Sequence, residues 1–269
     1  MLDSALARMA WVTGSYLAYL ILPIVLLIVG SVGEIWLNTL LPHGVTTRWY
    51  LDVWSDGSFR RAFVVSLEVA AATCVVTALL GLPLAYAIYG AASRGVRAAA
   101  RLLALLPIAV PPLVLGFGFV LVFSSDVLPY LGSVWVLIAG HVVLTLPYIV
   151  QTLVADMRHL RLGILLQAAE SLGASGPRRF FDIVVPSLRY SLGSGLVTVA
   201  ALSIGEFQLS NLVAGFLTRP YPVVLLQAFY GATGFACAAT TILLALALLG
   251  SLTGSLAARG TSAAGAASA

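Results

Sequence analysis

Apolar residues in this chain come in long blocks that are separated by short polar segments. A helix satisfies every backbone hydrogen bond within one lipid-facing segment, whereas a membrane barrel would show alternation of apolar and polar residues instead. Each block is near the length of about 20 residues that a helix needs to cross the hydrocarbon of a bilayer. We therefore predict an all-α membrane protein with six transmembrane helices: Trp11–Val32, Ala62–Tyr89, Leu102–Phe123, Val134–Met157, Ser187–Phe207 and Phe235–Leu256.

Composition supports the bilayer as the solvent for most of the chain. Of 269 residues, 61% are hydrophobic and 9% are charged, whereas about a quarter of the residues in an ordinary soluble domain are charged. All 14 basic residues are arginine, but no arginine cluster is interleaved with exposed aromatics, so no nucleic acid binding is expected. Cys74 and Cys237 lie in separate apolar blocks without metal-ligand spacing, so we expect buried thiols and no metal site.

The arginines also predict the orientation of the six helices. If both termini are cytoplasmic, ten arginines lie on the inner side: Arg8, Arg94, Arg97, Arg101, Arg158, Arg161, Arg178, Arg179, Arg189 and Arg259. Only four then lie on the outer side: Arg48, Arg60, Arg61 and Arg219. Cytoplasmic loops of membrane proteins are enriched in basic residues. The expected topology is therefore N-in and C-in.

The chain is expected to form one membrane domain. Residues 1–10 form a cytoplasmic N-terminus, residues 11–257 form the transmembrane domain, and residues 258–269 form a disordered cytoplasmic tail of Ala, Gly and Ser. The first apolar block is too long for a signal peptide and lacks a small-residue cleavage site, so it is expected to remain as a helix. Two connections are long enough to carry a function, the outer segment 33–61 and the inner segment 158–186.

The inner segment 158–186, which we call the coupling loop, has the pattern of two short helices joined by an elbow. Ala168 and Ala169 favour a helix with little side-chain bulk, Gly173 can end it in the left-handed region, and Pro177 can start the next one. Small side chains on an exposed helix let another protein's backbone come close. The segment therefore suits insertion into a partner's groove, although an inner loop that packs only on its own helices is the alternative.

These residues resemble the EAA loop of the permeases of binding-protein-dependent ATP-binding-cassette (ABC) importers. The loop pattern is Glu-Ala-Ala, three residues, Gly, nine residues, Ile, one residue and Leu-Pro. Five positions match it: Ala168, Ala169, Gly173, Ile183 and Pro186. Gln167 replaces the glutamate and Val185 the leucine, so an ion pair with the ATPase at position 167 is in doubt, with Glu170 as a possible substitute. The resemblance covers about Phe59 to Leu256.

The resemblance implies a permease subunit of the bacterial inner membrane that works with separate partners. A dimer of ABC ATPase subunits would dock on the coupling loop through Gln167, Ala168, Ala169, Glu170, Gly173, Ala174, Ile183 and Pro186. A second permease, expected to be a different polypeptide, would complete the pore, and an extracytoplasmic solute-binding protein would deliver solute. The chain contains no lysine and so no phosphate-binding Gly-Lys-Ser/Thr motif. It is therefore expected to hold no cofactor, with ATP and Mg bound by the partner ATPase.

Charged groups inside a membrane span need a reason, because each costs about 2.5–3.5 kcal/mol at a helix centre. Glu206 is the main candidate, at the expected outer end of the fifth span. With Glu206, we predict a patch that lines the solute pathway, formed by Gln208, Ser210 and Asn211. The alternatives are a glutamate that snorkels to the interface or pairs with Arg219.

Other polar residues in the spans have simpler interpretations. Glu68, near the outer end of the second span, is expected to form an interfacial or inter-subunit ion pair. His141 in the fourth span is expected to be an interhelical hydrogen-bonding residue rather than a proton relay or metal ligand. Pro107, Pro111 and Pro112 are expected to bend the third span.

The solute is predicted to be small and cationic. The region from Ser203 to Gly215 and on to Pro222 resembles the second permease of polyamine importers and of related ferric-iron, thiamine and phosphonate systems. Polyamine permeases have an acidic pair near this place, whereas the Gly-Glu-Phe around Glu206 is closer to the iron and thiamine relatives. An acidic residue favours a cation, which supports a polyamine-like solute.

Two rival functions remain at this point. A secondary transporter would show inverted repeats and paired broken helices, and the two halves of the chain have no evident similarity. An intramembrane serine protease would need a Ser–His dyad, for which Ser194 and His141 are the candidates. Six-helix proteases of that kind place Ser before His in the chain, and Gly-Ser-Gly in a membrane helix is usually a close-packing motif.

Overall fold

Helices occupy the predicted apolar blocks in the computed structural model, which describes residues 2–248 except for 37, 38, 40 and 92. The chain divides into two compact units, residues 1–60 with 224–269 and residues 61–223. Among the described residues, three helices are long and apolar enough to cross a membrane, and one bent pair adds a fourth candidate. The chain is thus a multi-pass, mainly helical membrane protein.

The first unit contains two apolar helices, a pair of short strands and a short helix. Its elements are α1 (Leu2–Ser31), β1 (Gly33–Ile35), β2 (His43–Val45), α2 (Arg48–Ser55) and a helix over Thr233–Leu248. The strands form an antiparallel hairpin, and the Trp49 indole N–H donates to the Gly33 carbonyl (2.7 Å). The end of the predicted sixth span and the predicted tail 258–269 lie outside the described residues.

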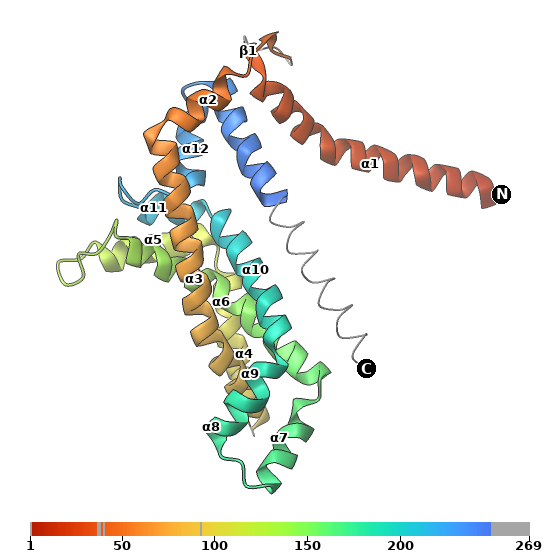
Figure 1. The fold of residues 1–269 in the computed structure, drawn as a ribbon, viewed down its shortest axis with the longest axis vertical. Helices are drawn as coiled ribbons and strands as arrows, with labels where there is room; N and C mark the ends of the chain where they lie inside the picture. The colour runs from red at the N-terminus through yellow and green to blue at the C-terminus, as the bar shows by residue number, and fades with distance from the viewer. Residues whose placement is uncertain (1, 37–38, 40, 92, 249–269) are drawn as a thin grey trace. The chain divides into compact units, whose positions relative to one another are not determined.

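The second unit contains the coupling loop and the candidate pathway residues. It starts within α3 (Gly57–Gly90) and continues with α4 (Arg94–Ala109), α5 (Pro112–Phe123), α6 (Val134–His159) and α7 (Leu162–Ser171). Next come α8 (Gly176–Arg178), the π-helix η1 (Arg179–Val184), α9 (Val185–Ser187), α10 (Arg189–Ile204) and α11 (Gln208–Val213). The boundary at residue 223 falls within the last helix, α12 (Tyr221–Phe229). In Figure 1, α7 and α8 lie at the lower end of α3, away from α5 and α11.

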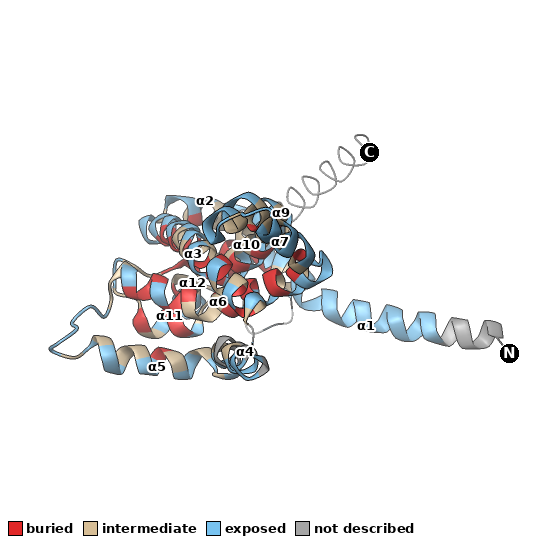
Figure 2. Cartoon of the chain, turned by 90° about the horizontal axis from the view of Figure 1, so that it is seen from below, coloured by how far each residue is buried: buried red, intermediate tan, exposed pale blue. Residues whose placement is uncertain are grey.

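The prediction of one continuous third span is wrong, because α4 ends at Ala109 and α5 begins at Pro112. Val110 and Pro111 both have extended backbones, with ψ of 122° and 137°. Each precedes a proline, and the ring of a proline disfavours the helical conformation of the residue before it. Two successive prolines therefore break the helix where a bend was expected, and α4 and α5 point in different directions (Figures 1 and 2).

The predicted fifth span, Ser187–Phe207, holds the helix α10 and is bent at its start. The segment Gly176–Ser187 and helix α10 meet at 68°, with Leu188 outside the helical region at φ −101° and ψ 5°. At its other end α10 stops at Ile204, three residues earlier than predicted. Glu206 therefore lies in the break between α10 and α11 rather than inside a helix.

The core of the second unit lies where α3, α6, α10 and α11 meet. Figure 2 shows buried residues along α6 and α11, whereas much of α5 is exposed. Leu137, Ile149 and Leu153 on α6 are fully buried. Gly195 on α10 faces the Ile149 side chain, which lies 3.2 Å from where a Cβ would be. Of the Gly-Ser-Gly sequence, only Gly195 therefore has the close-packing role that was expected, because Gly193 and Ser194 are exposed.

Two loops of the second unit cross at a pair of glycines. Gly132 and Ala214 form an isolated parallel bridge, and the Thr218 hydroxyl donates to the Gly132 carbonyl (2.9 Å) while accepting from the Gly215 N–H (2.8 Å). A Cβ on Gly215 would lie 2.5 Å from the Gly132 carbonyl oxygen. The backbones can therefore approach this closely only because position 215 has no side chain.

We expect Gly215→Ala to destabilise the protein by about 1–3 kcal/mol, the usual range for overpacking. The loss should appear as a lower midpoint in thermal unfolding of the protein in detergent. Gly193→Ala on α10 is the matched control, because no atom lies within 4 Å of its added Cβ. Equal midpoints for the two variants would show that the glycine crossing does not constrain the fold.

Candidate functional site

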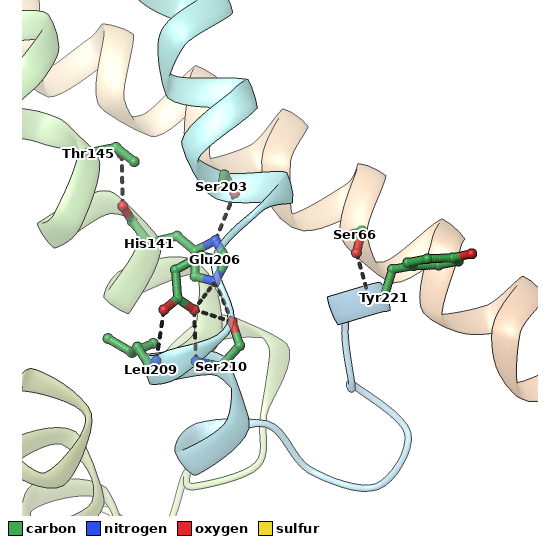
Figure 3. Close-up of polar contacts among 8 residues, drawn as sticks. All are labelled: Ser66, His141, Thr145, Ser203, Glu206, Leu209, Ser210 and Tyr221. Carbon is green, nitrogen blue, oxygen red and sulfur yellow. Dashed lines mark hydrogen bonds and ion pairs between the residues drawn. The ribbon is translucent and has the colours of Figure 1, made fainter. Parts of the chain in front are cut away.

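The break between α10 and α11 holds Glu206 by its carboxylate. One carboxylate oxygen accepts the Leu209 N–H (2.8 Å), and the other accepts the Ser210 N–H (2.9 Å) and the Ser210 hydroxyl (2.6 Å; Figure 3). A carboxylate at a helix N-terminus satisfies N–H groups that have no partner inside the helix. Glu206 therefore fixes the start of α11, and its side chain is only 10% exposed.

His141 joins α6 to both sides of this break. Its Nδ1 lies 2.7 Å from the Ser203 hydroxyl on α10, and its Nε2 lies 2.9 Å from the Ser210 hydroxyl on α11 (Figure 3). The ring is 1% exposed. The expectation that His141 is an interhelical hydrogen-bonding residue is confirmed.

The hydrogen bonds around His141 have a definite direction. Because the Ser210 hydroxyl donates its one proton to Glu206, its oxygen accepts from the Nε2–H of His141. In a neutral imidazole Nδ1 is then the acceptor, and the Ser203 hydroxyl donates to it. The chain of donors runs from Ser203 through His141 and Ser210 to the Glu206 carboxylate, so every polar atom along it has a partner.

A cavity of about 200 Å³ lies beside this chain of hydrogen bonds. Its polar lining comes from His141, Thr145, Tyr148, Ser203 and Glu206, and its apolar lining from Pro107, Val110, Pro112, Leu144 and Leu202. The broken connection between α4 and α5 thus forms one wall. A small cavity with apolar walls and few polar groups is the usual form of a small-molecule site.

The four predicted pathway residues divide into two pairs in the structure. Glu206 lines the cavity and Ser210 supports it, whereas Gln208 and Asn211 are exposed on α11 and do not line the cavity. The Glu206 carboxylate is held by the backbone of α11 and by Ser210 rather than extended into solvent. The Arg219 guanidinium lies over the Phe216 ring at 4.9 Å. Glu68, expected to form an ion pair, is exposed on α3.

Sequence reasoning missed Ser203, Thr145 and Tyr148 as site residues. Ser203 and His141 are 62 positions apart, and nothing local in the sequence links them. The Thr145 hydroxyl donates to the His141 carbonyl (2.8 Å) and lies 3.5 Å from the Thr77 hydroxyl on α3. The only available signal was the spacing of His141, Thr145 and Tyr148, which places them on one face of a helix.

The protease alternative loses its proposed dyad. Both ring nitrogens of His141 bond to other serines, while the Ser194 hydroxyl is exposed and donates to the Ser191 carbonyl (3.1 Å). A nucleophile must lie within hydrogen-bond reach of its base. Ser194 and His141 therefore do not form a catalytic pair in this structure.

The second candidate site is the coupling loop, whose predicted elbow is confirmed in its backbone. Helix α7 ends at Ser171, and Gly173 has φ of +80°. The Ala174 N–H bonds back to the Ala169 carbonyl (2.9 Å), which is a common way to end a helix with a left-handed glycine. Pro177 lies in the first turn of α8, as predicted. The loop is thus a helix, a left-handed elbow and a second helical segment.

Glu170 has a partner inside the loop. Its carboxylate lies 2.8 Å from an Arg179 guanidinium nitrogen, and this ion pair joins α7 to η1 across the elbow. Glu170 was the possible substitute for the glutamate that is missing at position 167. Its carboxylate already pairs with Arg179, so an ion pair with the ATPase would have to compete with this contact. Gln167 and Ala168 are exposed and Ala169 and Ala174 are half-buried, so three of these four positions carry only a methyl group.

Large apolar side chains surround these small ones on the loop surface. Ile164, Leu165, Leu172 and Phe181 are 51–88% exposed. Ile183 is half-buried and Pro186 exposed. An exposed apolar patch that is rimmed by polar residues is typical of a protein interaction site.

Comparison with curated proteins finds transport permeases, although no family model matches the chain. The chain is 28% identical to the spermidine/putrescine transport system permease protein PotC of Escherichia coli (strain K12), over 91% of this chain and 90% of the relative. It is 25% identical to PhnV of Salmonella typhimurium, over 87% of each chain. PhnV is provisionally named as a permease protein of a 2-aminoethylphosphonate transport system.

Solved structures with the same fold are also ABC transporters. The complex of a bacterial alginate ABC transporter with its alginate-pentasaccharide-bound periplasmic protein contains a chain with a TM-score of 0.70 and 17% identity. The match covers 94% of this chain and 93% of that one. An amino acid ABC transporter determined with histidines has a TM-score of 0.54 at 15% identity. At these identities the likeness concerns the fold.

Proposed function

We propose that this chain, a permease subunit of a binding-protein-dependent ABC importer, forms one half of a solute pathway and is driven by a separate ATPase at its coupling loop. The observation that carries the proposal is the pair of alanines, Ala168 and Ala169, on the surface helix α7, followed by the left-handed elbow at Gly173. The sequence relatives, both named as transport permeases, support the same role for this loop.

The proposed topology has six spans with both termini in the cytoplasm. They are α1, α3, the broken pair α4 and α5, α6, α10 with its bent lead-in, and the helix that starts at Thr233. The excess of arginines on one side supports the orientation. In this arrangement the coupling loop is cytoplasmic, between the fourth and fifth spans, where an ATPase could reach it.

The proposed partners would supply the ATP-binding site that this chain lacks and would cover the apolar side chains that its coupling loop exposes. A chain without lysine has no phosphate-binding loop of the common type, so we assign ATP and Mg to a dimer of ATPase subunits. The exposed apolar side chains of the coupling loop would be covered by that dimer. A second permease would complete the pore, and an extracytoplasmic binding protein would supply solute, as the periplasmic protein does for the alginate transporter.

The cavity beside His141 is the proposed place where solute passes. Its carboxylate, hydroxyls and apolar walls would suit a small cation with a hydrocarbon part, which agrees with a polyamine-like solute. The alternative function is a secondary transporter, in which an ion gradient rather than ATP drives the solute through the same cavity. Solute-stimulated ATP hydrolysis by the assembled complex would separate the two.

Gly173→Val tests the coupling loop by straining the backbone of its elbow. Position 173 has open space for a side chain but a left-handed backbone, which costs a non-glycine residue about 1–2 kcal/mol. We expect ATP-driven uptake to fall about fivefold to thirtyfold, the factor that such a free energy represents. Initial uptake rates in membrane vesicles measure this.

Two controls accompany Gly173→Val. Gly173→Asn should keep most of the uptake, because asparagine tolerates the left-handed region. Gly176→Ala should be neutral, because its added Cβ meets open space and its backbone φ is not positive. Normal solute-stimulated ATP hydrolysis and uptake in Gly173→Val would count against a coupling role for the elbow.

A further inference from the structure

The first turn of α7 is capped by a side chain from another helix. The Gly163 N–H donates to the Tyr89 hydroxyl, at 2.8 Å, and Tyr89 belongs to the last turn of α3. The first N–H groups of a helix have no partner within it, and the residue before α7, Arg161, makes no side-chain cap. Tyr89 therefore supplies a hydrogen bond that the loop itself does not.

The local backbone is shaped for this contact. Arg161 has φ of +50°, which is unusual for a residue other than glycine, and it redirects the chain between α6 and α7. A Cβ on Gly163 would lie 3.2 Å from the Tyr89 hydroxyl oxygen, so glycine allows the close approach. Leu162 between them is buried. The start of α7 is thus fixed against α3 at a defined point.

The same turn of α3 also contacts the second half of the coupling loop. The Tyr86 ring lies 5.5 Å from the Phe180 ring of η1, and the Glu170–Arg179 ion pair joins η1 back to α7. One turn of α3 therefore touches both sides of the Gly173 elbow. Nearer the start of α3, the Thr77 hydroxyl lies 3.5 Å from the hydroxyl of Thr145, which lines the cavity.

We propose that Tyr89 is a positioning residue that passes displacement of α7 to α3, and through α3 to the wall of the cavity. This inference rests on the proposed function, because it needs an ATPase that moves α7. The inference goes beyond the proposed function because it names α3 as the helix that moves with α7 and the Tyr89 hydroxyl as the group that connects them. The ring contact between Tyr86 and Phe180 is apolar and has no fixed direction, whereas the Tyr89 hydrogen bond is directional.

Tyr89→Phe tests the link by removing only the hydroxyl. In the purified complex of all subunits, reconstituted into lipid vesicles, we expect solute transported per ATP hydrolysed to fall about threefold to tenfold, the factor for one hydrogen bond. Basal ATP hydrolysis and the amount of assembled complex should be unchanged. Tyr130→Phe, in the exposed loop between α5 and α6, is the matched control and should keep the wild-type ratio.

A second variant makes the test specific to the contact. Gly163→Ala alone should also lower the transport ratio, because its Cβ crowds the hydroxyl. Added to Tyr89→Phe, it should cause little further loss, because the crowded oxygen is gone. An unchanged ratio in Tyr89→Phe, additive losses in the double variant, or loss of assembly in Tyr89→Phe would each overturn the proposal. Failure of the wild-type complex to couple ATP to uptake would refute the proposed function instead.

Discussion

Ala168→Arg is expected to prevent docking of the ATPase and abolish ATP-driven uptake. Ala168 is exposed on α7, and arginine is a good helix former, so the permease itself should fold normally. In the docked state a long side chain would hold the helices apart and leave a charge without a partner. Burying an unpaired charge at an interface costs about 2–5 kcal/mol, which corresponds to about a thirtyfold or greater loss of affinity.

Copurification of the ATPase with tagged permease measures docking, and uptake into vesicles measures its consequence. Ala168→Ser is the control for size and should be close to wild type. Val127→Arg is the control for charge, because Val127 is 85% exposed in the loop between α5 and α6, on the proposed outer side. Wild-type docking by Ala168→Arg would show that the ATPase does not contact this face of α7.

Glu206→Gln is expected to remove most transport while leaving ATPase docking intact. Both carboxylate oxygens accept hydrogen bonds, so an amide must turn its NH2 toward a donor. Hydrogen bonds to a charged group are each worth about 1.5–3 kcal/mol, so uptake should fall about tenfold to a hundredfold. The variant also removes the carboxylate that we assign to a cationic solute.

Two comparisons separate these effects of Glu206→Gln. Ser210→Ala removes one hydrogen bond to the carboxylate but keeps its charge, so it should lose less uptake of a cationic solute. Asn211→Ala, on the exposed side of α11, should have little effect. If Ser210→Ala is as defective as Glu206→Gln, the role of Glu206 is to hold α11 rather than to meet solute.

Local backbone chemistry was readable from the sequence, and contacts between distant helices were not. The coupling loop was predicted in its parts because Gly173 and Pro177 have strong conformational preferences of their own. The same kind of knowledge pointed to the third span, although two prolines in sequence broke it rather than bent it. Val110 and Pro111 each precede a proline, so two successive residues are held in the extended conformation and the helix cannot continue through them.

The sequence pointed to Glu206 as a candidate site residue but not to the residues that surround it in the structure. Glu206 was found because a charge in an apolar block is costly. Its partners were not found, because the hydrogen bonds from His141 to Ser203 and Ser210 cross 62 and 69 positions. Gln208 and Asn211 were chosen as neighbours in sequence, but the direction of α11 exposes them. Similarly, the sequence does not show that Glu170 pairs with Arg179, nine positions away, across the elbow.

Uptake by the reconstituted complex, driven in turn by ATP and by ion gradients, tests the central claim most directly. The chain, its ATPase, the second permease and the binding protein are placed in sealed vesicles, and accumulation of a labelled polyamine is followed. We predict accumulation only when ATP is present on the side of the coupling loop, and loss of that accumulation in Ala168→Arg. Accumulation driven by an ion gradient without ATP, or by Ala168→Arg as by wild type, would contradict the account.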